Sequence, residues 1–150
     1  MKLSKFCDET LVEFNLKSTN KDEVLVELVN LIARSNMVTD HDSLLEDIKE
    51  RENLVTTGVG YGVAFPHAKT KSVKGIVIAF GKSEAGIEFD AMDHRPVNIF
   101  FIIAAPEDAI GAHLNVMARL SYLMKSEENR NKLMAASSQG DVLALMDNVE

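Results

Sequence analysis

A run of glycines at alternate positions restricts the local structure of this chain more than any other feature. Gly58, Gly60 and Gly62 stand at every second position of one short segment. Glycines at this density disfavour a helix and permit a close approach of the backbone, so we expect a tight loop here. The apolar residues 63–65 follow and are typical of a short strand, which Pro66 should end because its nitrogen cannot donate a hydrogen bond.

Hydrophobic periodicity on either side of this loop predicts strands that alternate with helices. We expect strands over residues 10–16, 75–80 and 97–104. The expected helices cover residues 21–35, about 40 to 52, 110–125, a segment capped by Ser126, and a short last segment for which Asp141 is a candidate cap. Strands with such apolar runs between helices indicate the α/β class. We therefore expect a single domain over residues 1–150, a sandwich in which helices flank both faces of one mixed β-sheet.

The charge balance argues against one class of partner. The chain has 16 basic and 23 acidic residues, a net charge of -7, which disfavours binding to nucleic acid. No apolar stretch reaches the length of a membrane span, and the first residues lack an apolar signal region. We expect a cytoplasmic protein that does not insert into a membrane. The single cysteine, Cys7, is interpreted as a small half-buried side chain, with a reactive thiol as the alternative.

His67 is the first candidate for chemistry because of its place directly after Pro66, at the end of a strand that leaves the glycine-rich loop. A neutral imidazole nitrogen is a competent nucleophile toward phosphorus near neutral pH. The glycines upstream would allow backbone N–H groups to approach an anion. The alternative is a histidine that only caps the end of the strand through hydrogen bonds. Either ring nitrogen remains a candidate for the attack.

Two further residues are candidates for the same site. His113 lies in the first turn of the helix expected at 110–125, on its inward face, where N–H groups and the helix dipole favour an anion. Its alternative is a histidine whose hydrogen bonds are satisfied within the core. Arg51 directly precedes the loop and could bind a phosphoryl group through two hydrogen bonds. Its alternative is a solvated position in the charged run 49–52.

Other chemistries fit the sequence poorly. His41 and His94 are interpreted as surface residues. The sequence has no cysteine cluster for structural zinc, no H-E-x-x-H pair, no P-loop lysine and no G-x-S-x-G elbow. We therefore expect neither a metal nor a cofactor.

The segment 50–67 resembles the active-site signature of a known family, the enzyme IIA domains of the fructose/mannitol type. These domains belong to the bacterial phosphoenolpyruvate-dependent sugar phosphotransferase system. Their pattern reads R-E and then S-T-G-I-G-x-G-I-A-I-P-H, and this chain has Arg51-Glu52 and then TTGVGYGVAFPH over residues 56–67. The segments 89–97 and 112–114 are also similar to the family, so the resemblance spans essentially the whole chain.

The resemblance implies a role for each matching position. His67 would accept a phosphoryl group from the histidine of the carrier protein HPr and give it to an enzyme IIB component. His113 would be the second histidine of the site, and Arg51 would neutralise phosphate charge. The pocket loop would consist of Thr57, Gly58, Gly60, Gly62 and Pro66. Phe65 and Tyr61 would contribute to an apolar rim that docks HPr.

Two other functions stay open. Some members of the family are nitrogen-type regulators whose phosphorylation state controls binding to other proteins, and the 150 residues contain no segment that represents a IIB or IIC component. A metal-dependent hydrolase that uses His67 and His113 is a third possibility, although no ligand spacing in the sequence supports it.

Overall fold

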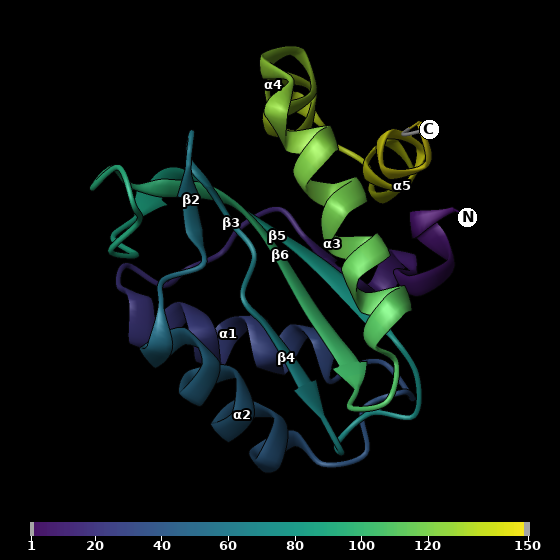
Figure 1. Cartoon of the computed structure of the whole chain (residues 1–150). Coiled ribbons are helices and arrows are strands. Elements are labelled where there is room, and N and C mark those ends of the chain that lie inside the picture. Colours follow the sequence, from purple (N-terminus) through teal and green to yellow (C-terminus); the bar gives the residue numbers. More distant parts are fainter. Residues whose placement is uncertain (1, 149–150) are drawn as a thin grey trace.

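A computed structural model describes residues 2–148 and shows one six-stranded mixed sheet with helices on both faces (Figure 1). The strands are β1 (Val12–Glu13), β2 (Gly58–Gly60), β3 (Val63–Ala64), β4 (His67–Thr70), β5 (Val77–Ile87) and β6 (Val97–Pro106). The helices are α1 (Lys21–Ile32), α2 (His41–Leu54), α3 (Ile110–Lys125), α4 (Glu127–Ala135) and α5 (Gln139–Asp147). The predicted α/β sandwich is confirmed. None of the helices in residues 2–148 combines the length and apolarity needed to cross a membrane.

The long strands β5 and β6 form the centre of the sheet. They are antiparallel, with Phe80 opposite Phe101, and their apolar side chains are almost completely buried. The expected strand 75–80 begins two residues too early and ends too soon, because β5 spans Val77–Ile87. Its second half is polar in sequence and partly exposed, and its register with β6 shifts between Lys82 and Ile87, so hydrophobicity alone does not indicate a strand there.

Strands β3 and β4 lie along the same side of β6 in one continuous register. Ala64 is paired with Phe100 and His67 with Ile103, both in parallel orientation. Pro66 interrupts this line because it has no N–H, although its carbonyl still accepts a hydrogen bond from the amide of Ile103 at 3.0 Å. The predicted short strand that ends before Pro66 is confirmed as β3, but His67 also begins a further strand, β4, which was not expected.

The glycine-rich segment forms a β-hairpin, not the expected loop. Strand β2 pairs with β3 in antiparallel orientation, and Tyr61 and Gly62 form the turn with φ angles of 58° and 75°. Positive φ at both positions is the geometry that a tight hairpin requires, and glycine adopts it without strain. The close approach of the backbone is confirmed at Gly58, where a Cβ atom would lie 2.8 Å from the Cα of Ala91.

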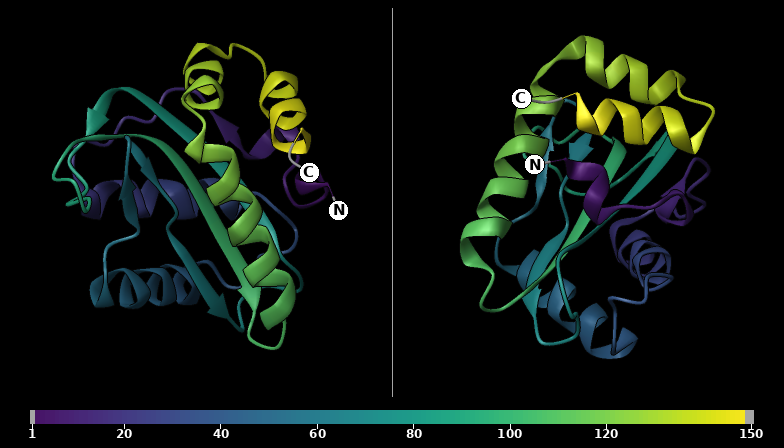
Figure 2. Two further views of the ribbon diagram at one scale, coloured as in Figure 1. Left: turned by 45° about the horizontal axis from the view of Figure 1, so that its top comes forward. Right: turned by 90° about the vertical axis from the view of Figure 1, so that its right-hand side faces the viewer.

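The helices form a layer on each side of the sheet (Figures 1 and 2). Helices α1 and α2 lie together on one face, and α3 crosses the other face before α4 and α5 return over the N-terminal turns. Asn20 caps α1 and Asp40 caps α2, close to the predicted starts. Helix α1 ends at Ile32, earlier than expected, whereas α2 continues past Glu52 to Leu54.

The two ends of the chain contain further corrections. The expected strand 10–16 is reduced to β1, because Asp8 accepts a hydrogen bond from the amide of Thr10 and starts a short 3₁₀ turn over Glu9–Leu11. Ser126 caps α4 as predicted. Helix α5 is capped by Ser138, whose hydroxyl accepts from the amide of Asp141, so the expected cap at Asp141 is wrong.

Cys7 is buried rather than half-buried. Burial is the main cause, with the neighbouring Asp8 carboxylate, of a thiol pKa raised to about 12. Such a thiol remains protonated at neutral pH and is a poor nucleophile.

Candidate active site

The side chain of His67 is held by a hydrogen bond to its own strand. Its Nδ1 lies 2.7 Å from the carbonyl oxygen of Phe65. A carbonyl oxygen can only accept, so Nδ1 carries the proton and Nε2 presents its lone pair. The hydrogen bond therefore selects one tautomer and leaves one ring nitrogen available as a nucleophile.

His113 lies beside His67, although it belongs to a different layer of the fold. It is in the first turn of α3, and its side chain is almost completely buried. The centroids of the two imidazole rings are 5.5 Å apart, and the rings are tilted by 44°. Nδ1 of His113 has no hydrogen-bond partner, so the interpretation as a satisfied core histidine does not hold.

Arg51 completes the group from the last turn of α2. One of its guanidinium nitrogens, Nη1, donates to the carbonyl oxygen of Val55 at 3.0 Å, which fixes the side chain against the end of the helix. A hollow of about 770 Å³ contains all three candidate residues. Its lining consists of Asp47, Glu50, Arg51, Asn53, Leu54, His67, Ala68, Lys69, His113 and Leu114. The structure thus brings together the residues that the sequence singled out for chemistry.

Both histidines are neutral near pH 7. Burial is the largest cause of the lowered pKa of His67, and the charges of Arg51 and Lys69 lower it further. The hydrogen bond to Phe65 and the charge of Glu52 act in the opposite direction. Burial also lowers the pKa of His113, assisted by His67 and Lys69. A neutral imidazole next to fixed positive charges can attack an electrophile and hold the anion that results.

Lys69 is a residue of this site that the sequence analysis missed. It lies two positions after His67 on β4, so both side chains are on the same face of the strand, opposite Ala68 and Thr70. The spacing would have indicated Lys69 if residues 67–70 had been recognised as a strand.

The expected pocket loop lies elsewhere. The hollow around His67 is lined neither by Thr57 nor by Pro66. The hydroxyl of Thr57 donates to Glu52, and the amide of Gly58 donates to the hydroxyl of Thr56, so these groups already have partners. The three glycines also lie outside the hollow: Gly58 packs on Ala91, and Gly60 and Gly62 lie in the hairpin, where they line a separate hollow.

The expected apolar rim also needs correction. Phe65 is buried and stacks on Phe101, so it cannot form a docking surface. Tyr61 is exposed at the tip of the hairpin, where its ring contacts the guanidinium of Arg130. The exposed apolar side chains that line the hollow around His67 are instead Leu54 and Leu114.

The remaining histidines lie outside this hollow. His41 is bonded to Asp42 and Asn30, and His94 is exposed in a turn, so the surface interpretation is confirmed. Within residues 2–148, no group of three or more His, Cys, Asp or Glu side chains converges on a point that could hold a metal ion.

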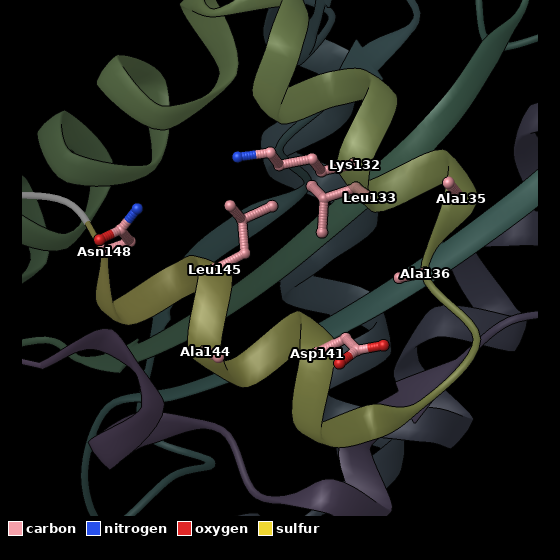
Figure 3. A pocket seen from close by; sticks show the side chains of 8 residues that line it. All are labelled: Lys132, Leu133, Ala135, Ala136, Asp141, Ala144, Leu145 and Asn148. Atoms are coloured by element: carbon pink, nitrogen blue, oxygen red, sulfur yellow. The ribbon is translucent and has the colours of Figure 1, made fainter.

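A hollow of about 570 Å³ between α4 and α5 is a possible alternative site (Figure 3). Small and apolar side chains form most of its wall, and Lys132 and Asp141 are the charged residues that line it. None of the residues that line it is a histidine, cysteine, serine or threonine. The hollow at His67 is therefore the candidate active site.

The comparisons with known proteins agree with this geometry. Residues 5–149 match a family described as "Phosphoenolpyruvate-dependent sugar phosphotransferase system, EIIA 2". The chain is 37% identical to a fructose-specific EIIA component of Haloferax volcanii over 89% of each chain. It is 35% identical to a fructose-specific EIIABC component of Bacillus subtilis over 98% of this chain, but it spans only 23% of that longer protein.

Solved structures extend the comparison to the fold. A nitrogen regulatory protein IIA-Ntr from Neisseria meningitidis superimposes with a TM-score of 0.89 at 30% identity, covering 96% of this chain and 98% of that one. Enzyme IIA of the mannitol system from Escherichia coli, in a complex with phosphorylated enzyme IIB, shares the fold with a TM-score of 0.80 at 19% identity, over 93% and 95% of the chains. The neighbouring histidines, the arginine beside them and the match over residues 5–149 lead to one conclusion: the chain belongs to the EIIA 2 family of the phosphoenolpyruvate-dependent sugar phosphotransferase system.

Proposed function

We propose that this protein is a phosphocarrier that accepts a phosphoryl group on Nε2 of His67 and passes it to a second protein. The observation that carries the proposal is the hydrogen bond from Nδ1 of His67 to the Phe65 carbonyl, which leaves Nε2 as the nucleophile. As Nε2 attacks, a new N–P bond forms while the bond between phosphorus and the donor nitrogen breaks. Nδ1 keeps its proton, and its hydrogen bond stabilises the positive charge that develops on the ring.

The neighbouring residues have complementary parts in this step. Arg51 neutralises the charge of the transferring phosphoryl oxygens and holds them in position. His113 lines the same hollow with its ring 5.5 Å from that of His67, and it supplies a hydrogen bond to the phosphoryl group or its acceptor nitrogen. The site requires no metal and no cofactor in this scheme.

The donor in the proposal is HPr, and the acceptor is an enzyme IIB component. The complex of mannitol IIA with phosphorylated IIB supports the second partner, since that protein has the same fold. The exposed side chains of Leu54 and Leu114, which are 77% and 63% accessible, would form the apolar docking surface beside His67. We also propose that the protein acts in the cytoplasm.

Transport of a sugar of the fructose/mannitol type is the leading role, because the fructose-specific relatives are 35% and 37% identical to this chain. A regulatory role is the second candidate, favoured by the TM-score of 0.89 to a nitrogen regulatory protein. The two roles differ in whether a IIB component removes the phosphoryl group. Incubation of the phosphorylated protein with the IIB domains of the same genome separates them: discharge supports transport, and full retention supports regulation.

Intact-mass analysis after incubation with phosphoenolpyruvate, enzyme I and HPr tests the proposal. We expect a gain of one acid-labile phosphoryl group in the wild-type protein and none in His67→Ala. His113→Ala should still accept some phosphate but transfer it onward more slowly. A His67→Ala protein that gains phosphate normally would contradict the assignment of the site.

A further inference from the structure

Glu52 is a buried carboxylate that the mechanism above does not use. In sequence it belongs to the charged run 49–52, but its side chain is only 2% exposed. Its two oxygens accept hydrogen bonds from Thr57, one from the amide at 2.8 Å and one from the hydroxyl at 2.5 Å. The ammonium group of Lys21, on α1, lies 3.0 Å from Oε2 and also contacts the ring of Phe89.

These contacts explain how a charge can be buried at this position. An isolated buried carboxylate is strongly destabilising, but two hydrogen bonds and one ammonium partner compensate for its loss of hydration. The three groups come from α1, from the end of α2 and from the residue that precedes β2. Glu52 therefore holds Thr57 in a fixed position relative to both helices.

Thr57 in turn is bonded to the strand that leads to His67. Its carbonyl oxygen accepts from the amide of Phe65 at 3.0 Å. The next residue, Pro66, directs its carbonyl toward β6, so the carbonyl of Phe65 points to the other side, away from the centre of the sheet. That carbonyl is the group that receives the Nδ1 proton of His67.

We propose that Glu52 is a positioning residue for the phosphoryl-transfer step: by fixing Thr57 it fixes the backbone of Phe65, and through the Phe65 carbonyl it selects the tautomer of His67 with the proton on Nδ1. The inference rests on the proposed function and adds a device that keeps Nε2 available as the nucleophile. The negative charge of Glu52 also raises the pKa of His67, which increases the basicity of the ring and partly offsets the effect of burial. Arg51 precedes Glu52 in the last turn of α2 and is held by a separate contact, the bond from its Nη1 to the carbonyl oxygen of Val55.

The tautomer can be read directly by ¹⁵N NMR of the histidine rings in the unphosphorylated protein. We expect the Nδ1–H tautomer of His67 to dominate in the wild type and to become part of a mixture in Glu52→Ala. The rate constant of phosphoryl transfer from HPr should fall about tenfold or more, as expected for a displaced nucleophile. Glu52→Gln keeps one acceptor for the Thr57 amide and should cause a smaller change of both quantities in the same direction.

Two control variants separate positioning from stability. Glu128→Ala removes an exposed carboxylate that pairs with Lys132 on α4, and it should change neither quantity. Val142→Ala weakens the core at α5 and should lower the free energy of unfolding while leaving the tautomer of His67 intact. If Glu52→Ala does not fold, Glu52→Gln carries the test.

The measurements distinguish a failure of the positioning role of Glu52 from a failure of the proposed phosphocarrier function. A wild-type tautomer ratio in a folded Glu52→Ala or Glu52→Gln protein would overturn the positioning role, whatever the transfer rates. An altered ratio that Val142→Ala reproduces would overturn it as well. Absence of phosphorylation in the wild type would contradict the proposed function but would leave the tautomer measurement unaffected.

Discussion

At the scale of single residues, the site depends on a histidine whose two nitrogens have different tasks. Nδ1 of His67 is bonded to a backbone carbonyl, and Nε2 is free to react. Arg51 and Glu52 are adjacent in sequence, yet one lines the hollow and the other is buried behind it. Two adjacent residues of one charged run therefore differ in environment: Arg51 lines the hollow, and Glu52 is buried.

The lowered pKa values predict a pH dependence. His67 and His113 should titrate below their ordinary value of 6.5, chiefly because both are buried. Arg51→Met removes a positive charge and should raise the pKa of His67, which an NMR titration of the ring signals would measure. An unchanged or lower pKa in that variant would show that Arg51 does not act on His67 through its charge.

The same shifts predict how stability changes with pH. A histidine with a lower pKa in the folded state than in the unfolded state makes the unfolded chain bind more protons just below pH 6.5. The contribution of the two histidines to the free energy of unfolding should therefore decrease as the pH falls through that region. Urea denaturation of the wild type and of a His67→Ala, His113→Ala double variant, at a series of pH values, isolates this contribution. Parallel pH profiles for the two proteins would refute it.

Lys69→Met should slow phosphoryl transfer and raise the pKa of both histidines. The reason is that Lys69 lies on the face of β4 that carries His67, and its charge disfavours a protonated imidazole at either position. We expect a rate loss of roughly tenfold, less than for a buried donor to a developing anion. Lys71→Met is the matched control, because Lys71 lies outside the hollow of His67 and should leave the transfer kinetics unchanged.

The sequence predicted some of these residues and not others for physical reasons. His67, His113 and Arg51 have unusual local contexts, and the structure brings them together in one hollow. The sequence shows Glu52 only as part of the charged run 49–52 and of the Arg51-Glu52 pair, because burial of its carboxylate depends on Lys21 and Thr57, which approach it only in the folded protein. Lys69 depends on the strand alternation of a segment that had not been recognised as a strand.

At the scale of elements, the glycine-rich hairpin is shaped by packing. Gly58→Ala would place a Cβ atom 2.8 Å from both the Cα and the Cβ of Ala91, so the backbone of one strand must shift. We expect a loss of about 1–3 kcal/mol in the free energy of unfolding, measured by urea denaturation. Gly111→Ala is the matched control: nothing lies within 4 Å of its added Cβ, and an alanine in α3 should stabilise the helix by up to about 1 kcal/mol. Equal effects of the two substitutions would contradict this account.

Elements whose own residues show a clear hydrophobic period were predicted well. Elements that form mainly through pairing with another strand were not. Helix α3 has the expected bounds because its apolar stripe repeats at helical spacing. Strand β4 is short and carries exposed polar residues, so its sequence alone gives no strand pattern. Its conformation follows from the register with β6, which only the folded chain reveals.

At the scale of the whole molecule, the site lies where two layers meet at the edge of the sheet. Strand β4 is on that edge, the C-terminal end of α2 lies beside it, and α3 begins on the other face (Figure 1). The α/β class and the helices on both faces could be predicted from the order of elements, and they are confirmed. The strand order could not, because it depends on contacts between segments that are distant in sequence.

This arrangement predicts a docking surface around the hollow. Leu54→Asp and Leu114→Asp should raise the KM for phosphorylated HPr by roughly tenfold, equivalent to about 1.4 kcal/mol, without changing the tautomer of His67. Tyr122→Asp is the control, since Tyr122 is an exposed apolar residue near the other end of α3. A KM that responds equally to all three variants would refute a specific surface at this place.

The central claim is that Nε2 of His67 carries the phosphoryl group while Nδ1 keeps its proton. NMR of the phosphorylated protein with ¹⁵N-labelled histidine measures this directly, because coupling between phosphorus and a ring nitrogen identifies the bonded atom. The account predicts coupling to Nε2 of His67, with Nδ1 still protonated. A phosphoryl group on Nδ1 of His67, or on any other residue, would contradict it.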